Sequence, residues 1–98
     1  MAKIEHILLY RFKPGIDRID EHLEVIRGFR GATEGLMDLQ CGRNVAAGSG
    51  GRFTHGFVMT FESRPALEKY NGSDAHRRLV SPFRDDMEEK LVVDIQVS

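Results

Sequence analysis

The sequence has little of three features that would each point to a class of protein. Cys41 is the only cysteine, so no internal disulfide can form, and a reducing, cytoplasmic setting is favoured. Lys and Arg number 14 against 15 Asp and Glu, a balance that lacks the basic surface needed for nucleic acid. No apolar run approaches the roughly 20 residues of a membrane span, and the run at 7–10 is too short for a signal peptide. These absences predict a soluble protein with neither nucleic-acid nor membrane partners.

The chain has a length of 98 residues, which predicts one domain over 1–98, and its apolar pattern predicts alternating strands and helices. The strands are expected over 3–12, 36–45, 52–61 and 91–97. The helices are expected over 17–31, 63–70, 73–80 and 81–90. Asp17, Ser63 and Ser73 are candidate helix caps, and Gly42 suits a bulge or bend. This order predicts an α+β fold of the ferredoxin-like βαββαβ type, with helices on one face of an antiparallel sheet.

A glycine-rich segment, "AAGSGGR" at 46–52, invites comparison with a phosphate-binding loop. Such a loop requires Gly-Lys-Ser/Thr leading into a helix. This segment has no lysine and leads into a strand, so it is interpreted as a hairpin connection.

The expected sheet is apolar on both faces. The side covered by helices is expected to carry Ile4, Leu8, Tyr10, Phe12, Phe57, Met59, Phe61, Leu91, Val93 and Ile95. The opposite side is expected to carry Ile7, Leu9, Val58 and Val92, flanked by Thr54, Thr60 and Asp94. Because an exposed apolar face of this size promotes association, the sequence predicts a homodimer that packs sheet against sheet.

Several segments together resemble a known family. They are "HILLYRFKPG", "CGRNV", "FTHGFVMTFES", "YNGSDAHRRLV" and "KLVVDI", which occur in order between His6 and Ile95. They resemble the stress-responsive dimeric α+β barrel (Dabb) family. The resemblance implies two ferredoxin-like protomers packed into a dimeric barrel, each with a small-molecule pocket between sheet and helices.

The resemblance also implies site residues. A plant member of the family, the polyketide cyclase that forms olivetolic acid, has its catalytic histidine and a contributing tyrosine in a Y-x5-H segment. These positions match His76 and Tyr70, while two other pocket histidines match His6 and His55. Leu8 and Phe57, which share strand faces with these histidines, are expected to contact the substrate. The residues at 71–75 are smaller and more polar than in the cyclase, which argues against a long alkyl-chain polyketide.

The chemistry of this pair suits proton transfer next to a carbonyl. If Ser73 is the N-cap, His76 lies in the first turn of a helix, whose partial positive charge favours a neutral imidazole. Asp74 opposes this effect by favouring the cation. A neutral histidine can act as a general base near pH 7, and Tyr70 could stabilise an enolate. The expected activity is that of a lyase or isomerase without a cofactor.

Other interpretations of these residues stay open. A histidine on an apolar strand face is often a hydrogen-bonded core residue, so the protein could be a non-enzymatic stress-associated binding or structural protein. Three histidines with Cys41 or Asp74 could bind zinc, but none has close ligand spacing, and no metal is predicted. Cys41 has no catalytic signature around it. A haem-degrading monooxygenase, built on a similar barrel, would find no axial ligand beyond these histidines.

Overall fold

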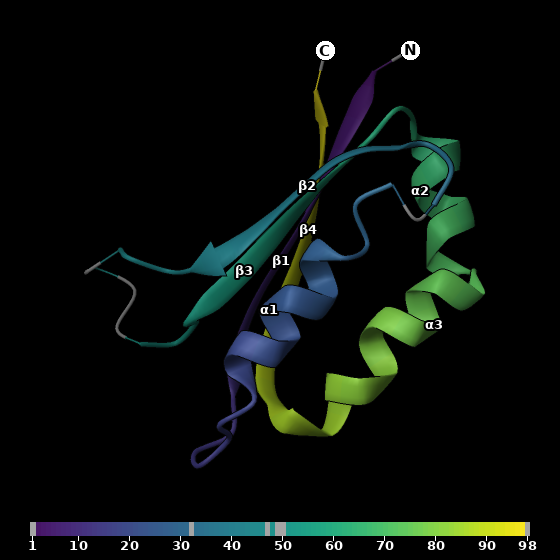
Figure 1. Ribbon diagram of the computed structural model, residues 1–98. Coiled ribbons are helices and arrows are strands. Elements are labelled where there is room, and N and C mark those ends of the chain that lie inside the picture. The colour runs from purple at the N-terminus through teal and green to yellow at the C-terminus, as the bar shows by residue number, and fades with distance from the viewer. Residues whose placement is uncertain (1, 32, 47, 49–50, 98) are drawn as a thin grey trace.

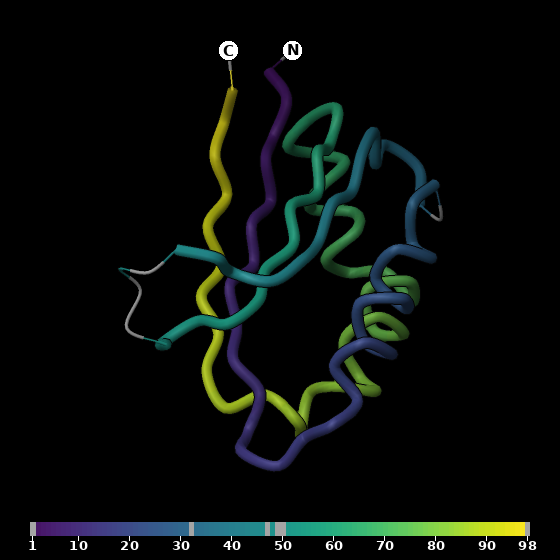
Figure 2. Tube along the Cα trace, turned by 60° about the vertical axis from the view of Figure 1, so that its left-hand side comes forward, coloured from purple at the N-terminus to yellow at the C-terminus, as the bar shows by residue number. Residues whose placement is uncertain are grey.

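The protein is one antiparallel sheet with its helices packed on one side. The computed structural model describes residues 2–31, 33–46, 48 and 51–97. The elements are β1 (Lys3–Phe12), α1 (Ile19–Arg27), β2 (Leu36–Arg43), β3 (His55–Phe61), α2 (Arg64–Asn71), α3 (Asp74–Val80), the 3₁₀ helix η2 (Ser81–Asp86) and β4 (Met87–Val97). The strands lie in the order β2-β3-β1-β4, and all neighbours are antiparallel. Figures 1 and 2 show the two layers, which confirm the predicted α+β, ferredoxin-like fold.

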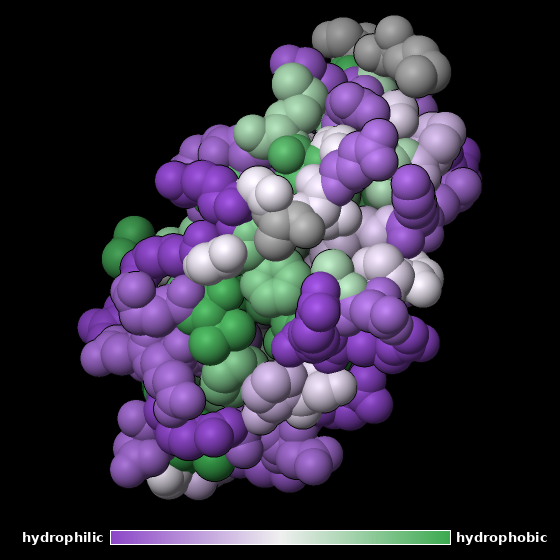
Figure 3. All heavy atoms as spheres, turned by 45° about the vertical axis from the view of Figure 1, so that its right-hand side comes forward, coloured by the Kyte–Doolittle hydropathy of each residue, from purple (hydrophilic) through white to green (hydrophobic). Residues whose placement is uncertain are grey.

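The core lies between the sheet and the helices. Alternate residues of β1 and β3 point into this layer, because successive side chains of a strand face opposite sides. The buried cluster comprises Ile4, Tyr10, Phe12, Ile26, Leu39, Phe57, Met59, Phe61, Leu67, Tyr70 and Leu79. Figure 3 shows the outside of the molecule turned toward the helical side, where hydrophilic residues surround a narrower hydrophobic area. The predicted inward faces of β1 and β3 are therefore confirmed.

Two of the three predicted helix caps are confirmed. The hydroxyl of Ser63 accepts a hydrogen bond from the Ala66 N–H at 3.3 Å, and Ser73 accepts one from the His76 N–H at 3.2 Å. The third prediction is wrong, because α1 begins at Ile19 after Arg18 and has no side-chain cap. With that first turn missing, α1 is shorter than the expected helix over 17–31.

The expected end of the last helix is also wrong. The 3₁₀ helix stops at Asp86, and β4 begins at Met87, four residues before the predicted strand. The cause is the length of β1, since Met87 to Lys90 pair with the last residues of that strand. Backbone pairing along a long neighbouring strand outweighs the local helical preference of this segment. The bulge expected at Gly42 is likewise wrong, because the irregular pairing of β2 lies between Leu36 and Asp38.

The faces of β4 are the reverse of the prediction. Directly opposite residues of antiparallel strands share one face, and Asp94 lies opposite His6 while Val92 lies opposite Leu8. Asp94 and Val92 therefore face the helices. The predicted orientation of β4 is wrong because this strand carries apolar residues on both faces, so its alternation does not define the inward side.

The uncovered side of the sheet is apolar at its centre. Its residues are Ile7 and Leu9 of β1, Val58 of β3, and Leu91, Val93 and Ile95 of β4. Val58 is 36% exposed and Ile95 is 46% exposed. In Figure 2 the helices lie on the other side of the strands and leave this face open.

Candidate functional site

The structure brings five of the six predicted site residues around one cavity. His6, Leu8, Phe57, Tyr70 and His76 line a hollow of about 340 Å³ between the sheet and the α2–α3–η2 segment. The remaining lining residues are His22, Asn71, Leu79, Val80, Arg84, Met87, Lys90, Val92 and Asp94. Most of the wall is apolar, so a few polar groups fix the orientation of a bound molecule.

His6 is held by a carboxylate. Its Nδ1 lies 2.5 Å from Oδ1 of Asp94, because the register of β1 and β4 places the two residues directly opposite each other. The His6 side chain is 9% exposed and that of Asp94 is 41% exposed, so the pair runs from the interior to the rim. A carboxylate on one ring nitrogen keeps the proton there and leaves Nε2 with its lone pair. This arrangement orients His6 as a hydrogen-bond acceptor or a base.

The ring of Tyr70 contacts two of the cavity histidines, His6 and His76. The centroid of its ring is 6.2 Å from that of His6 and 5.1 Å from that of His76, both in edge-to-face arrangements. Burial raises the pKa of Tyr70 to about 12, so the hydroxyl keeps its proton near neutral pH. Within the described part of the chain, this hydroxyl forms no hydrogen bond. It is therefore a donor for a bound molecule.

His76 is half-buried, and its pKa is lowered. Burial is the main cause, followed by the electrostatic effect of the nearby His6, Lys90 and Arg84 side chains. The neutral form expected from the sequence is thus favoured, although for different reasons than a helix start. The opposing effect expected of Asp74 is absent, because that carboxylate pairs with Arg77.

His22 is a second buried histidine at this cavity. Its side chain comes from α1, and its Nε2 lies 2.9 Å from the hydroxyl of Tyr10. Burial raises the pKa of Tyr10, so its hydroxyl stays protonated and shares one hydrogen bond with Nε2 of His22. Burial, followed by the charge of His55, lowers the pKa of His22 to about 4. The Nδ1 atom is buried without a hydrogen-bond partner among the described residues.

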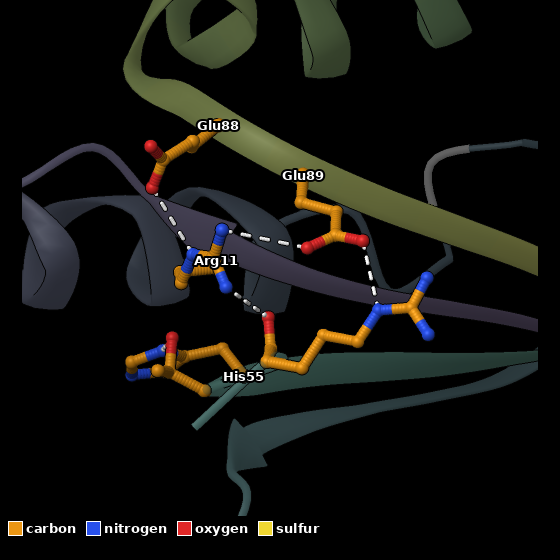
Figure 4. Close-up of polar contacts among 6 residues, drawn as sticks. Arg11, His55, Glu88 and Glu89 are labelled. Atoms are coloured by element: carbon orange, nitrogen blue, oxygen red, sulfur yellow. Dashed lines mark hydrogen bonds and ion pairs between the residues drawn. The ribbon is translucent and has the colours of Figure 1, made fainter. Parts of the chain in front are cut away.

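His55 lies outside this cavity. Its ring stacks on Tyr10 with centroids 6.0 Å apart, and its Nδ1 lies 2.8 Å from the hydroxyl of Thr54. It borders other hollows, toward the β2–β3 end of the sheet. Figure 4 shows His55 near an ion-pair network in which Arg11 lies between Glu88 and Glu89.

The sequence interpretation missed polar residues that complete the cavity. The sequence predicts Asp94 on the opposite face and Arg84 and Lys90 within a helix, and it assigns no site role to His22. The strand register was the one observation that could have identified Asp94, because an aligned β1–β4 pair brings it to His6. Arg84 and Lys90 depend on where η2 ends, which the sequence pattern did not define.

The cavity offers bases and donors in a mostly apolar setting. Among residues 2–31, 33–46, 48 and 51–97, no three or more His, Cys, Asp or Glu side chains are arranged to hold a metal ion. None of the helices formed by those residues has the length and apolar character to cross a membrane. The chemistry that the cavity residues themselves can perform is proton transfer.

Comparison with known proteins gives a consistent relationship. A family model described as Stress responsive A/B Barrel Domain matches residues 4–97. The stress-response A/B barrel domain-containing protein HS1 of Arabidopsis thaliana is 28% identical over 94 residues, which are 93% of this chain and 86% of that protein.

Solved structures share the fold over nearly the whole chain. A crystal structure of an Arabidopsis thaliana protein has a TM-score of 0.87 and 26% identity, covering 97% of this chain and 95% of that one. A dimeric ferredoxin-like protein from Jannaschia has a TM-score of 0.82 and 24% identity, covering 97% and 99%. A hydroxynitrile lyase from Passiflora edulis has a TM-score of 0.86 and 18% identity, covering 98% and 92%.

Proposed function

Because the chain belongs to the stress-responsive A/B barrel domain family, we propose that its cavity binds a small carbonyl compound and transfers a proton beside the carbonyl. The reaction class is that of a cofactor-independent lyase or isomerase. The hydroxynitrile lyase with the same fold is an example of lyase chemistry on this scaffold. A cytoplasmic setting, favoured by the single cysteine, belongs to the same proposal.

In this mechanism His76 takes the proton from the carbon next to the carbonyl. The lowered pKa of His76 keeps the imidazole neutral and able to accept it. Negative charge then develops on the carbonyl oxygen, where the protonated hydroxyl of Tyr70 donates a hydrogen bond. The imidazolium of His76 then returns this proton to another atom of the substrate, as an isomerisation or a bond cleavage requires. His6, oriented by Asp94, accepts a hydrogen bond from the substrate at Nε2 and holds it in place.

One observation carries the proposal: the Tyr70 ring meets both His6 and His76 edge to face in one mostly apolar cavity, with His6 tied to Asp94. A base and a second imidazole beside one phenol suit a substrate whose proton leaves one atom and arrives at another. A histidine that only filled the core would need no hollow beside it.

The test is exchange of carbon-bound protons in D₂O. Loss of the α-proton signal of a panel of small methyl ketones is followed by NMR with and without the protein. We expect catalysed exchange, reduced at least about tenfold in His76→Gln and in Tyr70→Phe, since general acid–base groups typically contribute more than that. His55→Gln is the matched control, because this histidine lies outside the cavity. Equal exchange by wild type and His76→Gln would contradict the assigned base.

We also propose that two copies pack through the uncovered sheet face. Val58, Val93 and Ile95 form an apolar surface there, and the Jannaschia protein of the same fold is described as dimeric. Burying such a surface against its symmetry copy removes it from water. Val58→Asp is expected to give monomer or insoluble protein by light scattering, whereas Val45→Asp, at a 91% exposed position off the strands, should leave the dimer intact. A dimer that survives Val58→Asp would contradict this assignment.

A second candidate is a non-enzymatic, stress-associated binding protein. It is favoured by His22 and His55, whose hydrogen bonds to Tyr10 and Thr54 are those of buried core residues. Under this candidate, small carbonyl compounds raise the melting temperature through the cavity, and no probe shows catalysed exchange.

A further inference from the structure

The rim of the cavity carries two cationic side chains that have no partner within the described residues. Arg84 comes from η2 and Lys90 from β4, and both are exposed. Most arginines of the chain form ion pairs, for example Arg18 with Asp86 at 2.9 Å, but no ion pair of Arg84 or Lys90 is formed in this part of the chain. What distinguishes Arg84 and Lys90 from other exposed cations such as Arg78 is that both line the cavity.

The one carboxylate that lines the cavity is already engaged. Asp94 binds Nδ1 of His6 at 2.5 Å, so it is not available to neutralise the two cations. Lys90 and Asp94 both face the cavity and are four residues apart on β4, which separates their Cα atoms by about 13 Å. The rim therefore has a positive end at Arg84 and Lys90, and a separate end where Asp94 orients His6.

We propose that the ligand of this cavity carries an anionic oxygen group, a carboxylate or a phosphate, which Arg84 and Lys90 bind at the positive end of the rim. This inference rests on the proposed function for the identity of the site, and it names the class of ligand. The guanidinium of Arg84 offers paired N–H donors that match two oxygens of such a group, and Lys90 adds a point charge. The apolar wall formed by Leu79, Val80 and Val92 suits the body of the same molecule.

The position of the cations fits the chemistry of the site. Arg84 and Lys90 line the same hollow as His76, so a ligand bound by them lies beside that histidine. A ligand anchored by its anionic group would extend along the cavity toward Tyr70 and His6. The anchoring charge then positions the carbonyl without taking part in the proton transfer.

The test compares a keto acid with its neutral ester, and adds an alkyl phosphate as a second anion. The affinities of 4-oxononanoate, its methyl ester and heptyl phosphate are measured by calorimetry and by amide shifts in NMR. We expect one anion to bind at least about tenfold more tightly than the ester, because charge-assisted hydrogen bonds are stronger than neutral ones. Arg84→Gln and Lys90→Gln should each weaken anion binding by about three- to tenfold and leave ester binding unchanged. Preference for the carboxylate or for the phosphate identifies which anion the rim selects.

Arg78→Gln is the matched control. Arg78 is exposed on α3, does not line the cavity, and its replacement removes the same charge. The proposal is overturned if the anions and the ester bind equally, or if neither anion binds at millimolar concentration. It is also overturned if Arg78→Gln weakens anion binding as much as Arg84→Gln and Lys90→Gln do.

These outcomes are separable from the proposed reaction. Anion binding that depends on Arg84 and Lys90, with no proton exchange by any probe, would refute the catalysis and leave the anion site intact. If neutral ketones exchange equally in wild type and in both variants, and acid and ester bind equally, the anion site is refuted and the catalysis stands.

Discussion

The acid sensitivity of the fold should depend on His22. This residue is 2% exposed, and its pKa is lowered to about 4, chiefly by burial. In the unfolded chain its pKa returns to about 6.5, so the unfolded state binds more protons between these values. His22 therefore destabilises the folded state as the pH falls through 6.5, and the loss is complete only below about 4. The unfolding free energy falls on acidification because the pKa of His22 is lower in the folded state than in the unfolded state.

The magnitude follows from the same two values. At about pH 5 the unfolded state gains about 2 kcal/mol relative to the folded state through this one residue, and near pH 4 it gains about 3 kcal/mol. Replacement by phenylalanine keeps a ring among Tyr10, Phe12 and Phe83 but removes the titration. The hydrogen bond with Tyr10 is also lost, which shifts the stability of the variant by a similar amount at both pH values.

The assay is urea unfolding of wild type and His22→Phe near pH 7 and near pH 5. Wild type should lose about 2 kcal/mol more unfolding free energy on acidification than the variant, because all other titrating groups are common to both. His76→Phe is the matched control. His76 is only half-buried, so this replacement should recover less of the acid loss. Identical acid losses in wild type and His22→Phe, or an NMR titration midpoint of His22 above about 6, would refute the reasoning.

Further predictions concern the packing that supports the cavity. Gly35→Ala should lower the free energy of unfolding by at least about 2 kcal/mol, because φ is +84° and a new Cβ would lie 2.6 Å from Cβ of Ala66. Gly15 has a similar φ and no such contact, so Gly15→Ala should lower the melting temperature less. Met59→Ala should cost about 2–5 kcal/mol in urea unfolding, whereas Met37→Ala, at a 53% exposed position, should stay within about 0.5 kcal/mol. Ser73→Ala should cost about 1 kcal/mol by removing the cap of α3, and a loss near zero would show that packing alone holds this helix.

The order of the elements could be predicted from the sequence because the local patterns are strong. Phe57, Met59 and Phe61 alternate with smaller residues over β3, and Ser63 and Ser73 provide the oxygens that begin α2 and α3. These features depend on neighbours in the chain, so the chain itself reveals them. Four of the six candidate site residues, His55, Phe57, Tyr70 and His76, come from these segments.

The features that were missed depend on partners distant in the chain. Asp94 reaches His6 through a strand register spanning the two ends of the sequence, and no local pattern fixes that register when both faces of β4 are apolar. Arg84 and Lys90 face the cavity because β4 begins early, in response to the length of β1. The resemblance and the inward face of β3 both predict His55 at the cavity, although its position along the strand decides which hollow it borders.

The pairing of β1 with β4 makes the two ends of the described chain neighbours. Lys3 lies opposite Val97, and the two termini lie side by side at the same end of the sheet, as Figure 1 shows. A linker of a few residues could therefore join these strands into a hairpin. The chain could then be reopened in the connection between β2 and β3, far from Tyr70 and His76. Such a circular permutant would turn the long-range His6–Asp94 contact into a local one, and its folding rate would report how much that contact delays folding.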